Sequence, residues 1–393
     1  MPKIDLKNLD KSDWKTYRFD QIVKNISERV EPGETDLEIY IGLEHIDAES
    51  IHIKRFGQPS DVEGQKLKCY PGDVIFGKRR AYQRKASVVI TEAICSAHAF
   101  VLRANPEVID PKLLPFFLHS DLFMHRAVDI SAGGLSPTIN WGILKIQEFL
   151  LPPKEQQAEL AELLWAMDEV IEKDLAVLEK LERLEKSILQ EIDDLIFGKA
   201  NSIGDFIDIK NGYAFSGSEL SEEKTPFVVV TPGNFMIGGG FSSVKFKYFT
   251  GQSYDEKFRF SNGDMIVTMT DLSKEGDTLG FPALIPEVKG IVFLHNQRLG
   301  KIIINDDSLK PMFLYHVLRT TRYRKHILNA ATKTTVRHTY PDRIKSFKFN
   351  KPNDEIQRFY IKKMEDSTIL LNNSAQKISA SKALQKSLIN EVF

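Results

Sequence analysis

The feature that most constrains the fold of this chain is an internal repeat, in which the 393-residue sequence resembles itself at an offset of about 200 residues. The matching residues keep the same order and spacing in both copies. The matching pairs are Pro111 and Pro311, Leu114 and Leu314, Leu118 and Leu318, Lys145 and Lys345, Pro152 and Pro352, Glu155 and Glu355, and Gln157 and Gln357. Chance matching of common residues is the alternative. Two similar units are expected, since each copy carries its own set of elements.

Both copies show the same succession of predicted elements. Short apolar and β-branched runs interrupted by Gly, Pro and Asn predict strands, the clearest being 37–46, 73–77, 87–91, 227–231 and 289–294. An amphipathic helix is predicted next, from Pro111 and from Lys310, and then a polar loop and one further strand. Gly72-Asp73 corresponds to Gly263-Asp264, so the offset changes slightly upstream, as expected when surface loops differ in length.

A long helix is predicted after each copy, over about 155–197 and 354–393. Apolar residues recur at spacings of three and four, which is typical of a coiled-coil seam. In the first helix these are Leu160, Leu164, Met167, Ile171, Leu175, Leu178, Leu181, Ile188, Ile192 and Leu195; in the second they are Met364, Thr368, Leu371, Ala375, Ile378, Leu384, Leu388 and Val392. An antiparallel pair would cover both apolar stripes, and each helix would span roughly 60 Å. The alternative is a pair of ordinary helices inside one large domain.

The expected fold is therefore α+β, with two pseudo-repeated globular domains separated by two long antiparallel coiled-coil helices. We place the globular domains at residues 1–152 and 199–350, and the helices at 153–198 and 351–393.

The charge of the chain is distributed unevenly along the sequence. The net charge is −1, but residues 154–199 contain thirteen acids and six bases, so the remainder carries 47 bases against 41 acids. The basic surface is therefore segregated from the first helix, a distribution that is compatible with a nucleic-acid partner.

Two cysteines, Cys69 and Cys95, are too few for a disulfide framework, which favours a reducing compartment. The first fourteen residues are too polar for a secretory signal, and no run approaches the roughly 18 apolar residues of a membrane span. We expect a cytoplasmic protein with no membrane partner.

Several motifs that would indicate catalysis are incomplete. Residues 72–78 match the first seven positions of a phosphate-binding loop, but Arg79 stands where a hydroxyl must hold Mg²⁺, and the middle residues are strand-like. A methyltransferase would need a Gly-rich cofactor loop and a Pro-Pro-aromatic motif, whereas Pro152-Pro153 is followed by Lys154. The nine histidines show no metal-binding spacing, and the acidic-x-Lys triplets are expected by chance. We predict no catalytic residue, cofactor-binding residue or metal ligand.

A dense cationic segment follows the predicted strand at 73–77. Its candidate DNA-binding residues are Lys78, Arg79, Arg80, Tyr82, Arg84 and Lys85. Lysine and arginine neutralise phosphates, arginine can also form two hydrogen bonds to guanine, and tyrosine can bond a phosphate. A solvated charged hairpin is the alternative interpretation.

The second copy carries a different candidate loop just before its last strand. Its candidate residues are Lys333, Thr334, Thr335, Arg337 and His338, with Arg322 on the preceding helix. At the offset of 200, the counterpart in the first copy contains Ser136, Thr138 and Asn140. Hydroxyls, an amide and an arginine suit contacts to base edges. Because the two loops differ in chemistry, the two domains are expected to bind different half-sites.

The sequence resembles the specificity subunits of type I restriction-modification systems over essentially its whole length. The segments that carry this resemblance are Tyr40–Ile46, Gly72–Lys85, Leu151–Ile171, Gly263–Thr270 and Asn296–Ile302. Each motif is weak alone, and their order is specific.

The resemblance implies two target-recognition domains, each binding one half of a bipartite site in double-stranded DNA, and helices that dock two methyltransferase subunits. It implies no cofactor in this chain: the methyltransferases use S-adenosylmethionine to methylate adenine N6, and restriction subunits, where they join, use ATP with Mg²⁺. Residues 351–357 depart from the usual Pro-Pro-x-x-Glu-Gln entry to the helix. Two rival hypotheses are a self-contained DNA-modifying enzyme with a degenerate site and a helical scaffold for other proteins.

Overall fold

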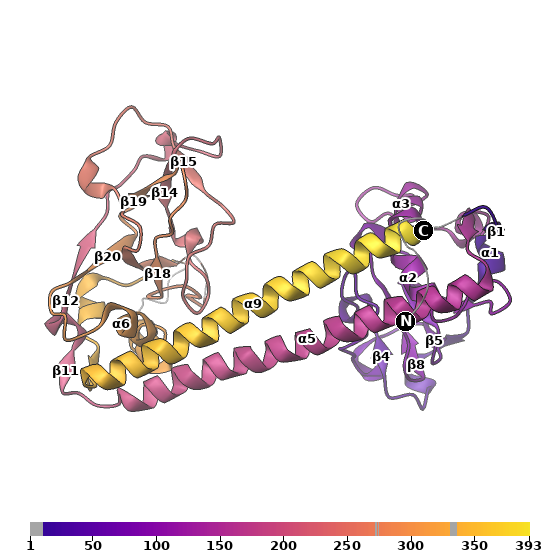
Figure 1. The fold of residues 1–393 in the computed structure, drawn as a ribbon, viewed down its shortest axis with the longest axis horizontal. Helices are drawn as coiled ribbons and strands as arrows, with labels where there is room; N and C mark the ends of the chain where they lie inside the picture. The colour runs from indigo at the N-terminus through magenta and orange to yellow at the C-terminus, as the bar shows by residue number, and fades with distance from the viewer. Residues whose placement is uncertain (1–10, 272, 274, 331–335) are drawn as a thin grey trace. The chain divides into compact units, whose positions relative to one another are not determined.

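The computed structural model describes residues 11–271, 273, 275–330 and 336–393. The chain forms two compact units, the first from residues up to 177 together with 374–393, and the second from residues 178–373 (Figure 1). Each unit contains one copy of the repeat. Among the described residues, no helix is long and apolar enough to cross a membrane.

The first unit is built on two four-stranded sheets. The first sheet is antiparallel and has the order β2 (Val23–Ile26), β9 (Ala99–Ala104), β6 (Val74–Gly77) and β7 (Ala86–Val88). The second sheet has the order β3 (Arg29–Val30), β5 (Lys66–Cys69), β8 (Ala93–Cys95) and β4 (Tyr40–Ile41), with β4 parallel to β8. A separate antiparallel pair joins β1 (Lys15–Arg18) to β10 (Glu148–Leu151), so the first and last strands of the copy meet.

Helices cover the first sheet of this unit. They are α1 (Phe19–Ile22), α2 (Leu114–His119), α3 (Asp121–Asp129) and α4 (Trp141–Leu144). The single helix predicted from Pro111 is two helices, because the Ser120 hydroxyl accepts a hydrogen bond from the Phe123 amide at 3.2 Å and starts a new helix there. Rings from both ends of the copy then meet in the core, where Phe123 lies 5.3 Å from Phe19 and 5.7 Å from Phe149.

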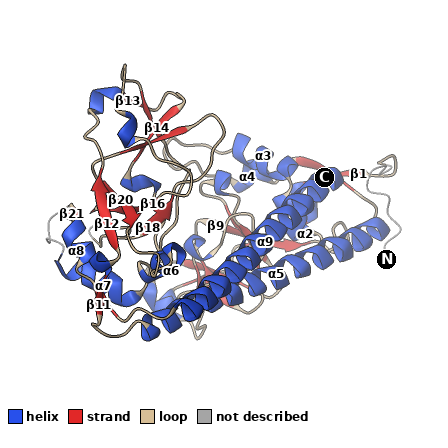
Figure 2. Cartoon of the chain, turned by 60° about the vertical axis from the view of Figure 1, so that its left-hand side comes forward, coloured by secondary structure: helices blue, strands red, loops and turns tan. Residues whose placement is uncertain are grey.

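The second unit repeats this order of elements (Figure 2). Its first sheet has the order β12 (Ile207–Asn211), β20 (Leu299–Ile304), β16 (Met265–Thr268) and β18 (Pro282–Leu284). Its second sheet has the order β13 (Leu220–Ser221), β15 (Lys247–Phe249), β14 (Phe227–Val230) and β19 (Val292–His295). The closing pair is β11 (Asn201–Ser202) with β22 (Lys348–Phe349), and the helices are α6 (Pro311–Val317), α7 (Thr321–Ala330) and α8 (Pro341–Lys345).

The second sheets of the two units differ in strand order. The four strands of each second sheet can be numbered in chain order. In the first unit the third strand pairs with the fourth, as β5 with β8. In the second unit the third strand pairs with the second strand, as β15 with β14. The parallel pair of second and fourth strands is kept in both units. The repeat therefore conserves the first sheet and rearranges the second.

A local structure common to both units follows the predicted correspondence of Gly72-Asp73 with Gly263-Asp264. Both glycines have a positive φ, +90° and +80°, which favours glycine over other residues. The Asp73 carboxylate accepts from the Tyr70 amide at 3.0 Å, and the Asp264 carboxylate accepts from the Ser261 amide at 2.7 Å. These turns place β6 and β16 in the same register, residue 73 matching residue 264.

Two long helices, α5 (Lys154–Leu195) and α9 (Asp354–Val392), run antiparallel, side by side (Figure 1). In the first unit Lys377 forms an ion pair with Asp174 at 2.8 Å, and in the second unit Lys363 forms one with Glu191 at 2.7 Å. The residue numbers rise on one helix as they fall on the other, as an antiparallel pair requires. The predicted α+β class with two long antiparallel helices is confirmed.

The predicted seam of the second helix is wrong at three positions. Thr368, Ala375 and Leu384 are exposed, Leu384 to 61%. The seam instead contains Ser367, which is buried, and Ser374 and Ser381, which are half-buried, in line with Ile378 and Leu388. Ser367 and Ser374 each come one residue before a predicted seam position, and Ser381 comes three residues before Leu384. Small serine side chains allow the partner helix to approach closely, so the seam of α9 is more polar than its hydrophobic pattern indicates.

Candidate nucleic-acid interface

In the first unit, two loops that are about 60 residues apart in the sequence pair with each other. Arg79, just after β6, forms a bridge with Thr138, just before α4. The Arg80 amide donates to the Pro137 carbonyl at 2.8 Å, and the Arg80 guanidinium donates to the Ser136 hydroxyl at 3.1 Å. The fold therefore brings together the cationic segment and the hydroxyl-rich loop that the sequence had suggested separately.

The second unit pairs the equivalent loops. Strand β17 (Thr270–Asp271) pairs with β21 (Arg337–His338), and the Thr339 amide donates to the Met269 carbonyl at 2.9 Å, as the Ile139 amide does to Lys78. Thr270 and His338 are also joined, with 3.2 Å between the hydroxyl and Nδ1. Residues 269–271 thus occupy the positions of residues 78–80.

Sequence analysis missed residues 269–271 as site residues. The signal that could have found them is the match of Gly72-Asp73 to Gly263-Asp264, because counting on from it gives Met269 for Lys78, Thr270 for Arg79 and Asp271 for Arg80. Without cations, that segment gave no chemical reason to be chosen.

One pair of equivalent positions, Arg80 and Asp271, has opposite charge in the two units. Arg79 and Arg80 are exposed cations, whereas Asp271 is buried and accepts hydrogen bonds from the Ser273 and Thr278 amides at 2.6 and 2.5 Å. Burial on its own raises the pKa of Asp271, but the hydrogen bonds from Thr278 and Ser273 outweigh it and lower the pKa. Asp271 therefore carries a stable negative charge that organises its loop.

The cationic loop of the first unit has an unusual backbone. Arg80 and Arg84 both lie in the left-handed region, with φ of 57° and 52°, on either side of the 3₁₀ turn Ala81–Gln83. Tyr82 projects from this turn and is largely exposed. Non-glycine residues in this region are uncommon and are retained where the surrounding structure fixes them, as it does here through the contacts of both arginines.

The hydroxyl and amide residues of the first unit lie beside that loop. Ser136 and Thr138 are half-buried, and Asn140 is exposed. The side-chain oxygen of Asn140, Oδ1, accepts from the Gly142 amide at 2.7 Å and so caps α4, which leaves the side-chain NH₂ group for other contacts.

Three of the predicted cations among the described residues have a carboxylate or a backbone carbonyl as their partner. Arg84 forms ion pairs with Glu49 at 3.1 Å and Asp121 at 2.8 Å and is 18% exposed, and Lys85 donates to the Leu43 carbonyl at 2.6 Å. Arg322 contacts Asp193, whose carboxylate lies 3.3 Å away. These three side chains stabilise the fold locally and are not part of the proposed interface.

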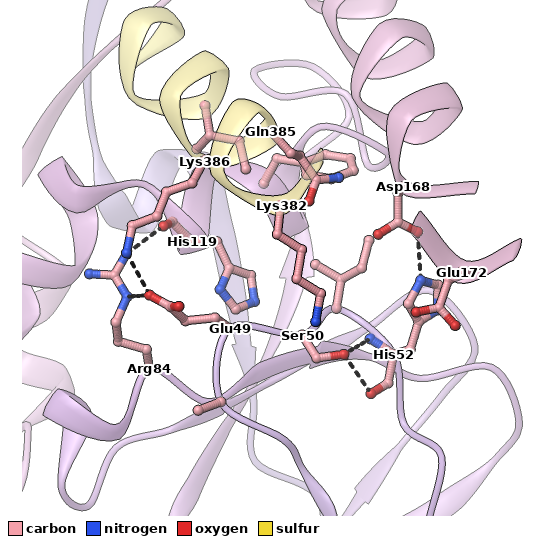
Figure 3. Close-up of a pocket in the computed structure, with 14 residues that line it drawn as sticks. Glu49, Ser50, His52, Arg84, His119, Asp168, Glu172, Lys382, Gln385 and Lys386 are labelled. Atoms are coloured by element: carbon pink, nitrogen blue, oxygen red, sulfur yellow. Dashed lines mark hydrogen bonds and ion pairs between the residues drawn. The ribbon is translucent and has the colours of Figure 1, made fainter. Parts of the chain in front are cut away.

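Arg84 lies at the edge of a cavity of about 170 Å³ within the first unit (Figure 3). The cavity separates the loop at residues 48–52 from α5 and α9. Lys386 of α9 forms an ion pair with Glu49 at 2.7 Å, and Asp168 of α5 accepts a hydrogen bond from His52 at 2.6 Å. These pairs fasten both long helices to the globular part of the unit.

The His52 imidazole is sensitive to this environment. Its hydrogen bond to Asp168 raises its pKa, against the opposing effect of burial. Lys382 extends from α9 toward Ser50 in the same cavity (Figure 3). The cavity therefore contains charges of both signs, mostly paired with one another.

The remaining predicted residues, Lys333, Thr334 and Thr335, lie outside the described part of the chain. Arg337 is half-buried and His338 is exposed. Within the described ranges, no group of three or more His, Cys, Asp or Glu side chains is arranged to hold a metal ion.

The second copy of the repeat matches a known domain family, the Type I restriction modification DNA specificity domain, over residues 199–380. This match covers less than half of the chain. Two curated proteins are similar to this chain. It is 26% identical over 234 residues to the EcoDI specificity subunit of Escherichia coli. It is 22% identical over 229 residues to the HindI specificity subunit of Haemophilus influenzae. These matches cover 54% and 55% of this chain, which spans about half the length of these relatives, 52% and 49%.

Solved structures share the fold over nearly the whole chain. A chain from a structural study of complex assembly and conformational transition in a type I restriction-modification system superposes with a TM-score of 0.60 at 17% identity, covering 96% of this chain and 97% of that one. The specificity subunit of M. genitalium gives a TM-score of 0.58 at 14% identity, with 98% of both chains covered. The resemblance to type I specificity subunits is thus confirmed, by the specificity-domain family in the second copy and by the fold in both.

Proposed function

We propose that this chain is the sequence-specific DNA-recognition subunit of a type I restriction-modification complex. The observation that carries the proposal is that the same two loops pair at equivalent positions in both units and carry different side chains. The same pairing of loops with different side chains suits a protein that binds two unlike halves of one asymmetric site. Residues 1–152 would bind one half and residues 199–350 the other.

In the first unit, the proposed interface consists of Lys78, Arg79, Arg80, Tyr82, Ser136, Thr138 and Asn140. The exposed arginines can form paired hydrogen bonds to guanine or neutralise phosphates, and Asn140 can pair with adenine. Because Arg80 is already bonded to Ser136, its guanidinium is oriented before DNA arrives.

In the second unit, the proposed interface consists of Thr270, Lys333, Thr334, Thr335, Arg337 and His338. It has fewer described cations than the first and an ordered carboxylate, Asp271, behind it. We expect its affinity to depend less on phosphate neutralisation and more on hydrogen bonds to bases.

The two long helices are proposed to dock two methyltransferase subunits. Val170, Val177 and Leu184 are exposed on α5 at intervals of seven residues, and Leu370 and Leu384 are exposed on α9. Apolar residues at this spacing share one face of a helix and suit a partner helix. In the proposed complex the methyltransferases supply S-adenosylmethionine chemistry, restriction subunits, where present, supply ATP with Mg²⁺, and this chain contributes no catalytic group.

The experiment that tests this function expresses the chain with its partner methyltransferase and maps methylated adenines across the genome. A single bipartite motif is the expected result, and no methylation is expected without this chain. The chain alone, incubated with DNA, Mg²⁺ and S-adenosylmethionine, should neither methylate nor cleave. Activity of the isolated chain would favour the self-contained enzyme, and failure of the complex to bind DNA in a salt-dependent manner would favour the scaffold.

Matched variants of the two loops test the division of labour. Arg80→Ala is expected to change base preference only in the half-site of the first unit, and Arg337→Ala only in the other half. Binding to a panel of duplexes with single-base changes in each half measures this. If either variant altered preference in both halves, the assignment of one half-site to each unit would be wrong.

A further inference from the structure

A basic hollow lies in the first unit, next to the proposed interface. We use this name for the concavity of about 110 Å³ lined by Arg29, Lys66, Lys78 and Phe100. Lys78 belongs to the lining of the hollow and is followed directly in the sequence by Arg79 and Arg80 of the proposed interface. The hollow is larger than the ~30 Å³ that one water molecule occupies in the liquid.

The cations of the basic hollow have no acidic partners among the described residues. Arg29 donates to the Gln65 side chain at 3.0 Å, and Lys66 donates to the Gly64 carbonyl at 2.7 Å. The Lys78 ammonium lies 5.2 Å from the centre of the Phe100 ring. By contrast, Arg84 and Arg103 of the same unit each contact a carboxylate.

Like charges are therefore held close together in a partly desolvated place. Burial, and next the positive charge of Arg29, lower the pKa of Lys78. Burial and then Arg79, Lys78 and Lys66 lower the pKa of His98 at the same edge. An arrangement that costs folding free energy through repulsion is compensated when an anion binds.

We infer that the basic hollow binds one phosphate of the DNA backbone beside the half-site contacted by the first unit. This inference rests on the proposed function. One guanidinium, from Arg29 on β3, and two ammonium groups, from Lys66 on β5 and from Lys78 just after β6, line the hollow, which suits the two free oxygens of a phosphodiester. The hollow adjoins the loop proposed to contact bases, so a duplex seated on that loop brings its backbone past Lys78.

The second unit has no counterpart of this phosphate site in its described residues. Met269, 6% exposed, occupies the position of Lys78. In the strand register, Phe76 pairs with Phe100 whereas its equivalent Val267 pairs with Gly300, so the ring under the ammonium is also missing. At this position, the described residues of the second unit therefore offer no equivalent phosphate site.

The test uses the complex of the full chain with its methyltransferase partner and compares Lys78→Met, Arg29→Gln and the double variant. Lys78→Met introduces the residue that the second unit has at this position. Each variant should weaken binding of cognate and scrambled duplexes alike, by about 5–10-fold at 0.1 M salt, and lower the slope of log K against log salt by about 0.9. Because Lys78 and Arg29 are assigned to the same phosphate, the double variant should lower the slope by about 0.9 as well, not by twice that amount.

A matched control is Lys15→Met, which removes the same charge from an exposed position on β1. It should leave the slope unchanged. Duplexes with one methylphosphonate linkage, which is uncharged, then locate the phosphate: one linkage should weaken the wild type and leave Lys78→Met unaffected. Thermal unfolding identifies a variant that fails to fold, and the methylphosphonate scan of the wild type still decides the case.

Three results would overturn the inference. If the wild type binds DNA with a steep salt slope and the hollow variants keep that slope, the hollow binds no phosphate and the proposed function stands. If the wild-type complex shows no salt-dependent DNA binding, the proposed function fails together with the hollow. A slope that falls equally in Lys15→Met would show a general charge effect and would also refute the site.

Discussion

The buried amide of Gln157 offers the sharpest test of how each globular part is joined to its long helix. Its oxygen accepts from the Asp110 amide at 2.6 Å, and its nitrogen donates to the Val108 and Pro152 carbonyls at 2.9 and 2.8 Å. The side chain is 1% exposed. One residue on the first turn of α5 thus satisfies three backbone groups that come from two separate segments.

Gln157→Ala removes all three hydrogen bonds and leaves the three backbone groups without a partner. At a net value of about 1 kcal/mol for each bond, the free energy of unfolding should fall by about 3 kcal/mol. For a unit of roughly 200 residues this corresponds to a fall in Tm of about 6–12 °C. The offset of 200 provides the matching variant, because Gln357 makes the same three contacts, with Lys310, Ser308 and Pro352, at 2.8, 2.9 and 2.9 Å.

Differential scanning calorimetry of the full chain measures both variants, and hydrogen exchange reports on the amides directly. The Asp110 amide should lose protection only in Gln157→Ala, and the Lys310 amide only in Gln357→Ala. Gln190→Ala is the control, since Gln190 is exposed and bonds only to Asp194, one turn away on the same helix. A fall in Tm of less than about 2 °C, or an equal fall in the Gln190→Ala control, would refute the reasoning.

Three further predictions concern stability and spacing. Arg84→Met should destabilise the first unit by about 1–3 kcal/mol, because it removes two ion pairs and the hydrogen bond to the His119 carbonyl, and should leave base preference unchanged; altered preference in a half-site panel would return Arg84 to the interface. The raised pKa of His52 means that its bond to Asp168 stabilises the fold fully below about pH 6.5, and that this contribution is lost as pH rises through the raised value. The difference in unfolding free energy between wild type and His52→Gln should therefore shrink from pH 6 to pH 9, and a constant difference would contradict it. Deleting residues 174–180 together with 371–377 keeps the heptad register and shortens both helices by about 10 Å, so the gap between half-sites in the methylated motif should shrink by about 3 base pairs; an unchanged gap in an active variant would exclude the helices as the spacer.

The duplication could be predicted because the two copies can be compared residue by residue, and the long helices because their apolar spacing is a local pattern. The match of Gln157 to Gln357 at the same offset reflects identical contacts, and the apolar spacing located α5 and α9 to within a few residues. The seam of α9 could not be predicted fully. Hydrophobic periodicity assigns serine to the exposed side, whereas Ser367 is buried because its small side chain permits close helix approach.

The pairing of the interface loops, and the roles of their side chains, depend on tertiary structure. The bridge between Arg79 and Thr138 joins segments about 60 residues apart, and no local pattern specifies it. Density of charge correctly marked the loop as unusual but could not separate Arg80, which is exposed, from Arg84, whose partners Glu49 and Asp121 come from elsewhere in the chain. Arg29 escaped notice because it stands alone in the sequence and joins Lys78 only through the fold.

The first compact unit has a consequence for the order in which the protein is made. Its core includes Leu388, Ile389 and Val392, and the Phe393 ring lies 5.2 Å from Phe117. Domains usually fold in the order in which they leave the ribosome. The first unit cannot complete its core until residues 374–393 are made, and these follow the whole of the second unit in the sequence. A chain interrupted before residue 388 would therefore leave Phe117 and its neighbours uncovered and accessible to proteases.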